Sequence, residues 1–171
     1  MKENVNFIEE NKVVLKTLFL FFFFVVIFYV LLYDLVNRIF LREFTAQIVA
    51  FLLNLSGFSA SVDGYFINMH NNFSLEVIYE CVGIWAMIVY SSFVLAYPTD
   101  LKKKLIGIAF GVPGLYAIGI VRMAVLAVIG VYYPNMWEYA HVYFWQLSLI
   151  IFVILLLLLW VEKVVKIEQS K

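Results

Sequence analysis

Long runs of apolar residues, separated by short polar stretches, dominate this chain. The first run, TLFLFFFFVVIFYVLLY from Thr17 to Tyr33, carries no charge. A helix that spans a bilayer needs about 20 mainly apolar residues, and three later segments approach that length. We therefore predict spanning helices at about 17–36, 81–97, 105–131 and 142–160.

A further apolar segment, from Phe44 to Phe58, is too short and too polar for a full span. It is interrupted by Gln47, Asn54 and Ser56. A segment of this kind favours an interfacial or re-entrant helix over a spanning one. We expect such a helix at about 44–58.

The pattern changes to alternation between residues 59 and 80. The stretches SVDGYFI and FSLEVIY alternate apolar and polar positions, and the turn-prone NMHNN lies between them. Strict alternation is typical of a half-buried strand. We predict a short β-hairpin on the membrane surface, directly before Cys81.

The composition sets the class of protein. Hydrophobic residues make up 65% of the chain and charged residues 14%, against roughly 45–50% and about 25% in soluble domains. A soluble chain of this length could not bury so much apolar surface. We expect an all-α polytopic membrane protein, a bundle forming a single integral membrane domain over residues 1–171. The first helix lacks a signal-peptide cleavage site and is expected to be retained.

The distribution of positive charge predicts the orientation of the bundle. With four spans and a cytoplasmic N-terminus, nine of the twelve basic residues lie inside: Lys2, Lys12, Lys16, Lys102, Lys103, Lys104, Lys163, Lys166 and Lys171. Cytoplasmic loops carry such an excess of Lys and Arg. The segments 59–80 and 132–141 then face outward, and a fifth span would expose three of these lysines. The net charge is zero and no basic patch is visible, so nucleic acid is not an expected partner.

The single cysteine, Cys81, follows Glu80 at the expected start of the second spanning helix. One cysteine excludes an intrachain disulfide and a cysteine-based zinc site, and we expect no metal and no cofactor. Cys81 could be a small core residue, since a free cysteine often behaves as a hydrophobe. It could also be a nucleophile, because the first turn of a helix and a nearby cation both favour the thiolate.

Two more polar residues are expected at the same face. Arg122 lies about nine residues before the helix end near Val131, roughly 13 Å below the surface. A charge at this depth is costly unless it pairs, so Arg122 is either structural, bound to carbonyls or to Glu80 or Glu138, or functional. His141 opens the last predicted helix, as an interfacial anchor or a proton carrier. The aromatic residues at 132, 133, 137, 143 and 145 are typical of an outer aromatic belt and could also line a substrate groove.

Together these residues would supply the groups that acyl transfer requires. His141 could take the Cys81 proton and return it to a leaving amine. Arg122 could donate hydrogen bonds to the oxyanion of a tetrahedral intermediate. Glu80 is either a supporting residue that orients Arg122 or simply the last polar residue before the membrane.

The order ECVGIW, then IVRMAVL, then His141 resembles the exosortase/archaeosortase family over about residues 45–160. These are membrane transpeptidases of bacteria and archaea. The resemblance implies a catalytic set of Cys81, Arg122 and His141, in the plasma membrane of a prokaryote and facing the extracytoplasmic side. It implies that the substrate is an exported protein with a C-terminal sorting signal, made of a short motif, a transmembrane helix and a basic tail. It further implies cleavage through a thioester and transfer to an acceptor, such as a lipid.

The chain departs from the family in two ways. Many members have an asparagine three residues before the arginine, where this chain has Gly119, and the chain is shorter than the larger members. A second hypothesis is a non-catalytic membrane assembly factor or substrate-binding subunit, with Arg122 as a structural or lipid-headgroup contact. A small transporter is disfavoured, because inverted repeats and paired intramembrane charges are not visible.

Overall fold

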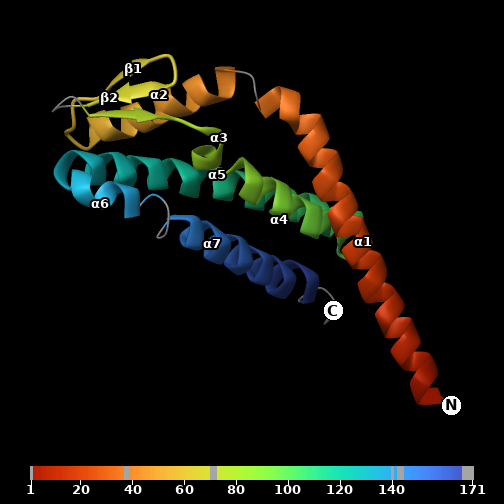
Figure 1. The fold of residues 1–171 in the computed structure, drawn as a ribbon. Helices are drawn as coiled ribbons and strands as arrows, with labels where there is room; N and C mark the ends of the chain where they lie inside the picture. Colours follow the sequence, from red (N-terminus) through yellow and green to blue (C-terminus); the bar gives the residue numbers. More distant parts are fainter. Residues whose placement is uncertain (1, 37–38, 70–72, 140, 142–144, 167–171) are drawn as a thin grey trace.

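A computed structural model describes residues 2–36, 39–69, 73–139, 141 and 145–166, with the side chains of 2–10, 32–36, 39, 79–80, 138, 145–146 and 166 excepted. The described chain is mainly helical and includes one small sheet (Figure 1). Its elements are α1 (Lys2–Val36), α2 (Ile39–Leu55), β1 (Ser61–Asp63), β2 (Phe66–Asn68), β3 (Ser74–Glu76), α3 (Tyr79–Val82), α4 (Ile84–Ala96), α5 (Leu101–Tyr132), α6 (Pro134–Tyr139), α7 (Trp145–Trp160) and the π-helical turn η3 (Val161–Lys166).

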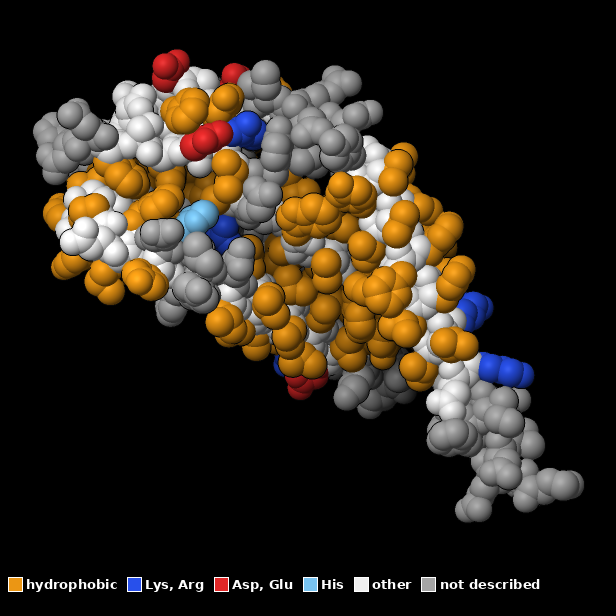
Figure 2. All heavy atoms as spheres, viewed as in Figure 1, with side chains coloured by type: hydrophobic (Ala, Val, Ile, Leu, Met, Phe, Trp, Pro, Cys, Tyr) orange, Lys and Arg blue, Asp and Glu red, His pale blue; other side chains and the backbone are white. Residues whose placement is uncertain are grey.

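Within the described residues, three apolar helical segments are long enough to cross a membrane: Asn11–Leu31 in α1, Leu101–Tyr132 in α5 and Leu147–Val165 in α7 and η3. Helix α4 is also apolar but has only 13 residues, about 20 Å of helix. Hydrophobic side chains cover most of the face seen in Figure 2, and one Lys or Arg side chain lies beside a histidine among them. The prediction of an all-α membrane protein is confirmed.

Helix α5 is the centre of the bundle and packs against α2, α3, α4, α6 and α7. Buried side chains of α2, the sheet and the second half of α5 form one apolar core, around Val49, Ile67 and Met123. A second core, around Tyr90 and Trp160, joins α4, the first half of α5 and α7. The two halves of α5 therefore pack in two different apolar cores.

The sheet has the antiparallel order β1–β2–β3 and packs on α2. Ile67 in the central strand pairs with Val62 and with Leu75. Ile67 and Leu75 are buried, whereas their neighbours along each strand are exposed, so the alternation places one face on the core. The predicted hairpin is present as β2–β3, and residues 70–72 at its tip lie outside the described residues. An additional strand, β1, precedes it through a turn at Gly64, whose φ of 59° is left-handed.

Arg42 on α2 holds the segment that leads from the sheet to Cys81. Its Nε donates to the carbonyl oxygen of Val77 at 2.6 Å, and its guanidinium pairs with Glu76 at 2.8 Å. The same guanidinium lies 3.7 Å from the centre of the Tyr65 ring. Since Val77 is only four residues before Cys81, α2 positions the approach to the cysteine.

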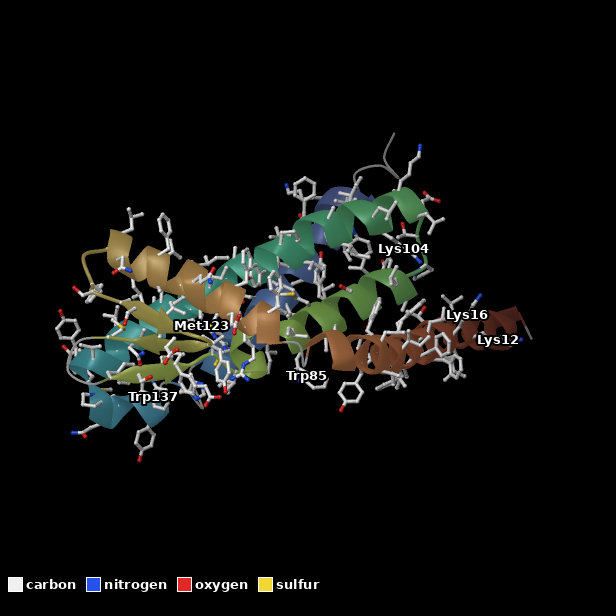
Figure 3. All side chains as sticks on the ribbon, turned by 90° about the horizontal axis from the view of Figure 1, so that it is seen from above. Lys12, Lys16, Trp85, Lys104, Met123 and Trp137 are labelled. Atoms are coloured by element: carbon white, nitrogen blue, oxygen red, sulfur yellow. The ribbon has the colours of Figure 1, made fainter. Side chains whose placement is uncertain are left out.

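The two ends of the bundle differ in chemistry. Lys12, Lys16 and Lys104 lie at one end, whereas Trp137 and the sheet lie at the other (Figure 3). At the lysine end, the indole of Trp160 donates to the carbonyl oxygen of Lys103 at 2.9 Å. This bond fixes the end of α7 against the start of α5, next to Lys104.

Candidate active site

Cys81 lies in a separate one-turn helix, α3, rather than at the start of the long apolar helix. Gly83 ends α3 with a left-handed φ of 82°, and α4 begins only at Ile84. The expectation that Cys81 opens the long helix is therefore wrong, because the glycine conformation separates the two helices. The Cys81 side chain is buried, at 3% exposure, and its amide donates to the carbonyl oxygen of Ile78 at 3.0 Å.

His141 lies beside the cysteine although 60 residues separate them along the chain. The distance from Cys81 Sγ to His141 Nε2 is 3.4 Å, within hydrogen-bond range for sulfur. Which atom donates depends on the imidazole tautomer and protonation. The helix that follows His141 is described from Trp145 onward. The pair has the geometry in which a base can take the proton of a thiol.

Arg122 reaches the same place from α5. Its side chain is buried, at 6% exposure, and a guanidinium nitrogen lies 3.5 Å from the carbonyl oxygen of Cys81. Ten residues separate Arg122 from the end of α5 at Tyr132, which corresponds to about 15 Å of helix. The structure thus brings together the three residues for which a catalytic role is predicted. The side chains of Glu80 and Glu138, considered above as partners of Arg122, lie outside the described residues.

Gly119 permits the close approach of α5 to the cysteine turn. A Cβ atom at this position would lie 3.1 Å from the carbonyl oxygen of Val82 and 3.7 Å from that of Cys81. Gly119 is one helical turn before Arg122, so this packing sets how far the guanidinium must reach.

The surroundings of His141 favour its neutral form. Burial lowers the pKa of the His141 imidazole below its ordinary 6.5, and the Arg122 cation lowers it further. The residue precedes the apolar segment that begins at Leu147. A neutral imidazole at pH 7 is ready to accept a proton, which suits a general base.

Trp137 is the neighbour of the site that the sequence pattern assigned to an aromatic belt. Its ring stacks on the His141 ring, with centroids 5.0 Å apart and planes 5° from parallel. The edge of Phe73 contacts the same indole, with a centroid distance of 6.3 Å. The spacing of four residues between Trp137 and His141 was the available signal, since such residues are neighbours on a helix.

An apolar groove opens beside Arg122, between α5 and α7. It has a volume of about 340 Å³ and is lined by Ala117, Ile118, Val121, Arg122, Val125, Ser148 and Phe152. Arg122 is thus part of the groove wall and also contacts the Cys81 backbone. Among the described side chains, no three His, Cys, Asp or Glu residues gather closely enough to hold a metal ion. The described groups point to acid–base and nucleophilic chemistry.

The family model for transmembrane exosortases matches residues 11–161 of the chain. The match covers α1 from residue 11 onward and every element from α2 to α7, including all three predicted site residues. No curated protein and no solved structure matches the chain.

Proposed function

The chain belongs to the transmembrane exosortase family, a family of membrane transpeptidases, and from this premise we propose that it is a cysteine transpeptidase acting on exported proteins. The proposed substrate ends in a sorting signal of a short motif, a transmembrane helix and a basic tail. The observation that carries the proposal is the convergence of Cys81, His141 and Arg122. A thiol, a base within 3.4 Å and a buried cation supply the three roles of acyl transfer.

The first half of the reaction forms a thioester. His141 Nε2 takes the proton of the Cys81 thiol, and the thiolate attacks the carbonyl carbon of the scissile peptide bond. Arg122 stabilises the negative charge that develops on the carbonyl oxygen. As the tetrahedral intermediate collapses, the C–N bond breaks and His141 returns its proton to the leaving amine. The new N-terminal piece stays on Cys81 as a thioester.

The second half transfers that piece to an acceptor. His141 removes a proton from the acceptor amine or hydroxyl, which attacks the thioester carbonyl. The C–S bond then breaks, and the proton returns to the Cys81 thiolate. The atoms balance without a redox partner, and the acceptor we propose is a lipid.

The groove beside Arg122 supports an approach of the substrate from the membrane. Cys81 and Arg122 are both nearly buried, so a peptide must reach them through an opening in the bundle. The groove is apolar and presents one charged residue, Arg122. An apolar segment that occupies the groove would bring its neighbouring peptide bond toward the guanidinium.

The distribution of lysines supports an extracytoplasmic site. Lys12, Lys16 and Lys104 lie at the end of the bundle opposite Trp137. Because lysines favour the cytoplasmic side, we propose that Cys81 and its neighbours face the outside of the plasma membrane. Cleavage there would act on the exported part of the substrate.

Substitution of Cys81 tests the proposal. The substrate would be a secreted protein whose sequence ends in an apolar helix and a basic tail, co-expressed with the enzyme and followed by the loss of its C-terminal segment. We expect Cys81→Ala and Cys81→Ser to abolish processing while both proteins accumulate normally. Ser92→Ala, which removes a fully buried hydroxyl from α4, is the matched control and should process normally. Normal processing by both Cys81 variants would overturn the proposal.

A non-catalytic assembly or substrate-binding subunit is the second candidate function. The contact between Arg122 and the main-chain carbonyl of Cys81 favours it, because a purely structural arginine makes the same contact. For such a subunit, Cys81→Ser would leave processing unchanged and Arg122→Gln would reduce the amount of folded protein. The two candidates therefore predict opposite results for the conservative cysteine variant.

A further inference from the structure

We propose that Trp137 is a positioning residue for His141, whose ring holds the imidazole against the Cys81 thiol and stabilises its protonated form beside the Arg122 cation. The inference rests on the proposed function for its catalytic meaning, but its test uses the chemistry of the thiol alone. Figure 3 shows Trp137 at the end of the bundle opposite the lysines.

The first observation is the geometry of the ring stack. The indole and imidazole planes are within 5° of parallel, and their centroids are 5.0 Å apart. A parallel stack disfavours tilting of the imidazole plane away from the indole plane. The Nε2 atom of the same imidazole lies 3.4 Å from Cys81 Sγ. The indole therefore supports the ring orientation on which the proton transfer depends.

The second observation is that Trp137 is itself held in place. Phe73 meets the indole edge-to-face, with planes 71° apart. The Phe73 ring in turn lies on the backbone of Gly130, where an added Cβ would collide with it. Phe73 therefore packs between the Gly130 backbone and the indole, and it holds the indole on the side of the hairpin. The position of His141 is thus supported by α5 and by the residue that precedes β3.

The third observation is that Trp137 makes its described contacts through its ring and not through its indole N–H group. Its Nε1 atom is buried and has no hydrogen-bond partner within the described part of the chain. Buried indole N–H groups usually find a partner. The contacts of Trp137 with His141 and Phe73 are instead ring contacts. A phenylalanine can therefore replace part of its contribution, whereas an aliphatic residue cannot.

The electrostatics explain why an aromatic ring is useful here. When His141 takes the thiol proton, it becomes a cation close to Arg122, which also carries a positive charge. The described groups that face His141 are Cys81 from α3, Arg122 from α5 and Trp137 from α6. Tyr139, the titratable side chain described on α6, is exposed. The face of an aromatic ring attracts a cation. The indole thus offsets part of the repulsion from Arg122.

The single cysteine allows a direct test. In the detergent-solubilised full chain, the rate at which iodoacetamide alkylates Cys81, followed by mass spectrometry of the peptide that contains it, reports on the Cys81 thiolate. We expect Trp137→Leu to lower this rate at pH 7 by about threefold to tenfold, which is the size of a cation–π contact. At about pH 10, where a thiol ionises without a base, the rates of Trp137→Leu and the wild type should converge. Trp137→Phe should lie between them at pH 7.

Two controls make the experiment selective. Trp85→Leu removes another stacked tryptophan, whose ring lies 5.3 Å from Tyr29, and it should alkylate like the wild type at every pH. In a His141→Gln background, Trp137→Leu should have no further effect, because the indole acts through the imidazole. An unchanged rate for Trp137→Leu at pH 7, an equal loss at every pH, or a loss that persists in the His141→Gln background would overturn the inference.

Failure of this inference and failure of the proposed function give different results. If Cys81→Ala leaves processing intact while Trp137→Leu changes the pH profile of alkylation, the proposed function fails and the role of Trp137 stands. If processing requires Cys81 while Trp137→Leu alkylates like the wild type, the role of Trp137 fails alone. Should Trp137→Leu not fold, the profile of Trp137→Phe decides, since a profile identical to the wild type would overturn the inference.

Discussion

Two cations are buried on the same helix, and their surroundings differ. Lys103 lies in the first turn of α5 with 8% exposure, and Arg122 lies 19 residues later with 6% exposure, about 28 Å along the helix. The Lys103 amine is 3.5 Å from the carbonyl oxygen of Val165 and 3.9 Å from the Asp100 carboxylate. Arg122 instead lies beside the thiol of Cys81 and the imidazole of His141.

The comparison shows that burial of a charge does not by itself mark a reactive site. Lys103 contacts the main-chain carbonyl of Val165 and the Asp100 carboxylate, and with the Trp160 hydrogen bond these contacts hold the end of α7 against the start of α5. Arg122 interacts electrostatically with Cys81 and with His141, two groups that can exchange a proton with each other, and an apolar groove opens at its side. The partners of a buried cation, more than its depth, indicate which end of the molecule performs chemistry.

The largest expected effect comes from exchanging the two cations for neutral residues. We expect Arg122→Gln to lower the rate of substrate processing by about 10³-fold, because loss of an oxyanion donor costs on this order. Lys103→Gln should change the rate by less than about twofold while lowering thermal stability, since it weakens hydrogen bonds of a charged group. The measurement is processing of the co-expressed substrate, normalised to the amount of folded enzyme. Equal losses of rate for both variants would remove the distinction between the two ends.

The second prediction concerns the pH dependence of the thiol end. His141 must be neutral to act as a base, so processing should fall as the pH drops through its lowered pKa. His141→Gln should lower the rate by about 10²-fold at pH 7 and flatten this profile. His70→Gln, which replaces the second histidine of the chain, is the matched control. A wild-type profile that stays flat down to the lowest pH at which the enzyme remains folded would contradict the role of His141.

The same lowered pKa predicts a smaller effect on stability. The unfolded chain binds a proton at His141 near the ordinary pKa of about 6.5, whereas the folded chain binds it only at lower pH. Stability is therefore expected to decrease as the pH falls from 6.5 to the folded-state pKa. Thermal unfolding of the His70→Gln variant, with and without His141→Gln, measures this. The second substitution should reduce the slope, and an unchanged slope would contradict it.

The sequence predicted the helices well because their apolar runs are long and uncharged. It also placed Cys81, Arg122 and His141 at one end, since spans and positive charges together determine which helix ends meet. It missed the break at Gly83, because a glycine inside an apolar run is tolerated in helices and carries no distinct local signal. The end of strand β1, by contrast, carries a recognisable local signal, because the Asp63–Gly64 pair is typical of a tight turn.

Details of the site depend on packing between distant segments. The stack of Trp137 on His141 and the support from Phe73 follow from where α6 meets the hairpin. Likewise, the closeness of Gly119 to the Val82 carbonyl follows from how α5 lies against α3. An aromatic residue at a membrane surface and a glycine in an apolar helix are both common, so these roles cannot be predicted from local sequence.

A fourth prediction sharpens the comparison along α5 itself. Gly119→Ala places a methyl group 3.1 Å from the Val82 carbonyl oxygen, which must push α5 away from the cysteine turn. We expect about a tenfold loss of processing, because small displacements of catalytic groups are costly. Gly114→Ala is the matched control, since nothing lies within 4 Å of its added methyl group. Equal rates for the two variants would show that the close approach at Gly119 does not position Arg122.

The smallest expected effect tests whether a supporting contact at each end of the bundle affects only stability or also the rate of processing. Arg42 and Trp160 each donate a hydrogen bond to a main-chain carbonyl, that of Val77 near the cysteine and that of Lys103 at the lysine end. Both Arg42→Gln and Trp160→Phe should lower stability by about 1–3 kcal/mol. Only Arg42→Gln should also slow processing, by about threefold, because Val77 leads directly into the Cys81 turn. Thermal unfolding and processing rates measured on the same samples separate the two effects. If Trp160→Phe slows processing as much as Arg42→Gln, the two ends are coupled through α5, and the distinction between a structural end and a reactive end does not hold.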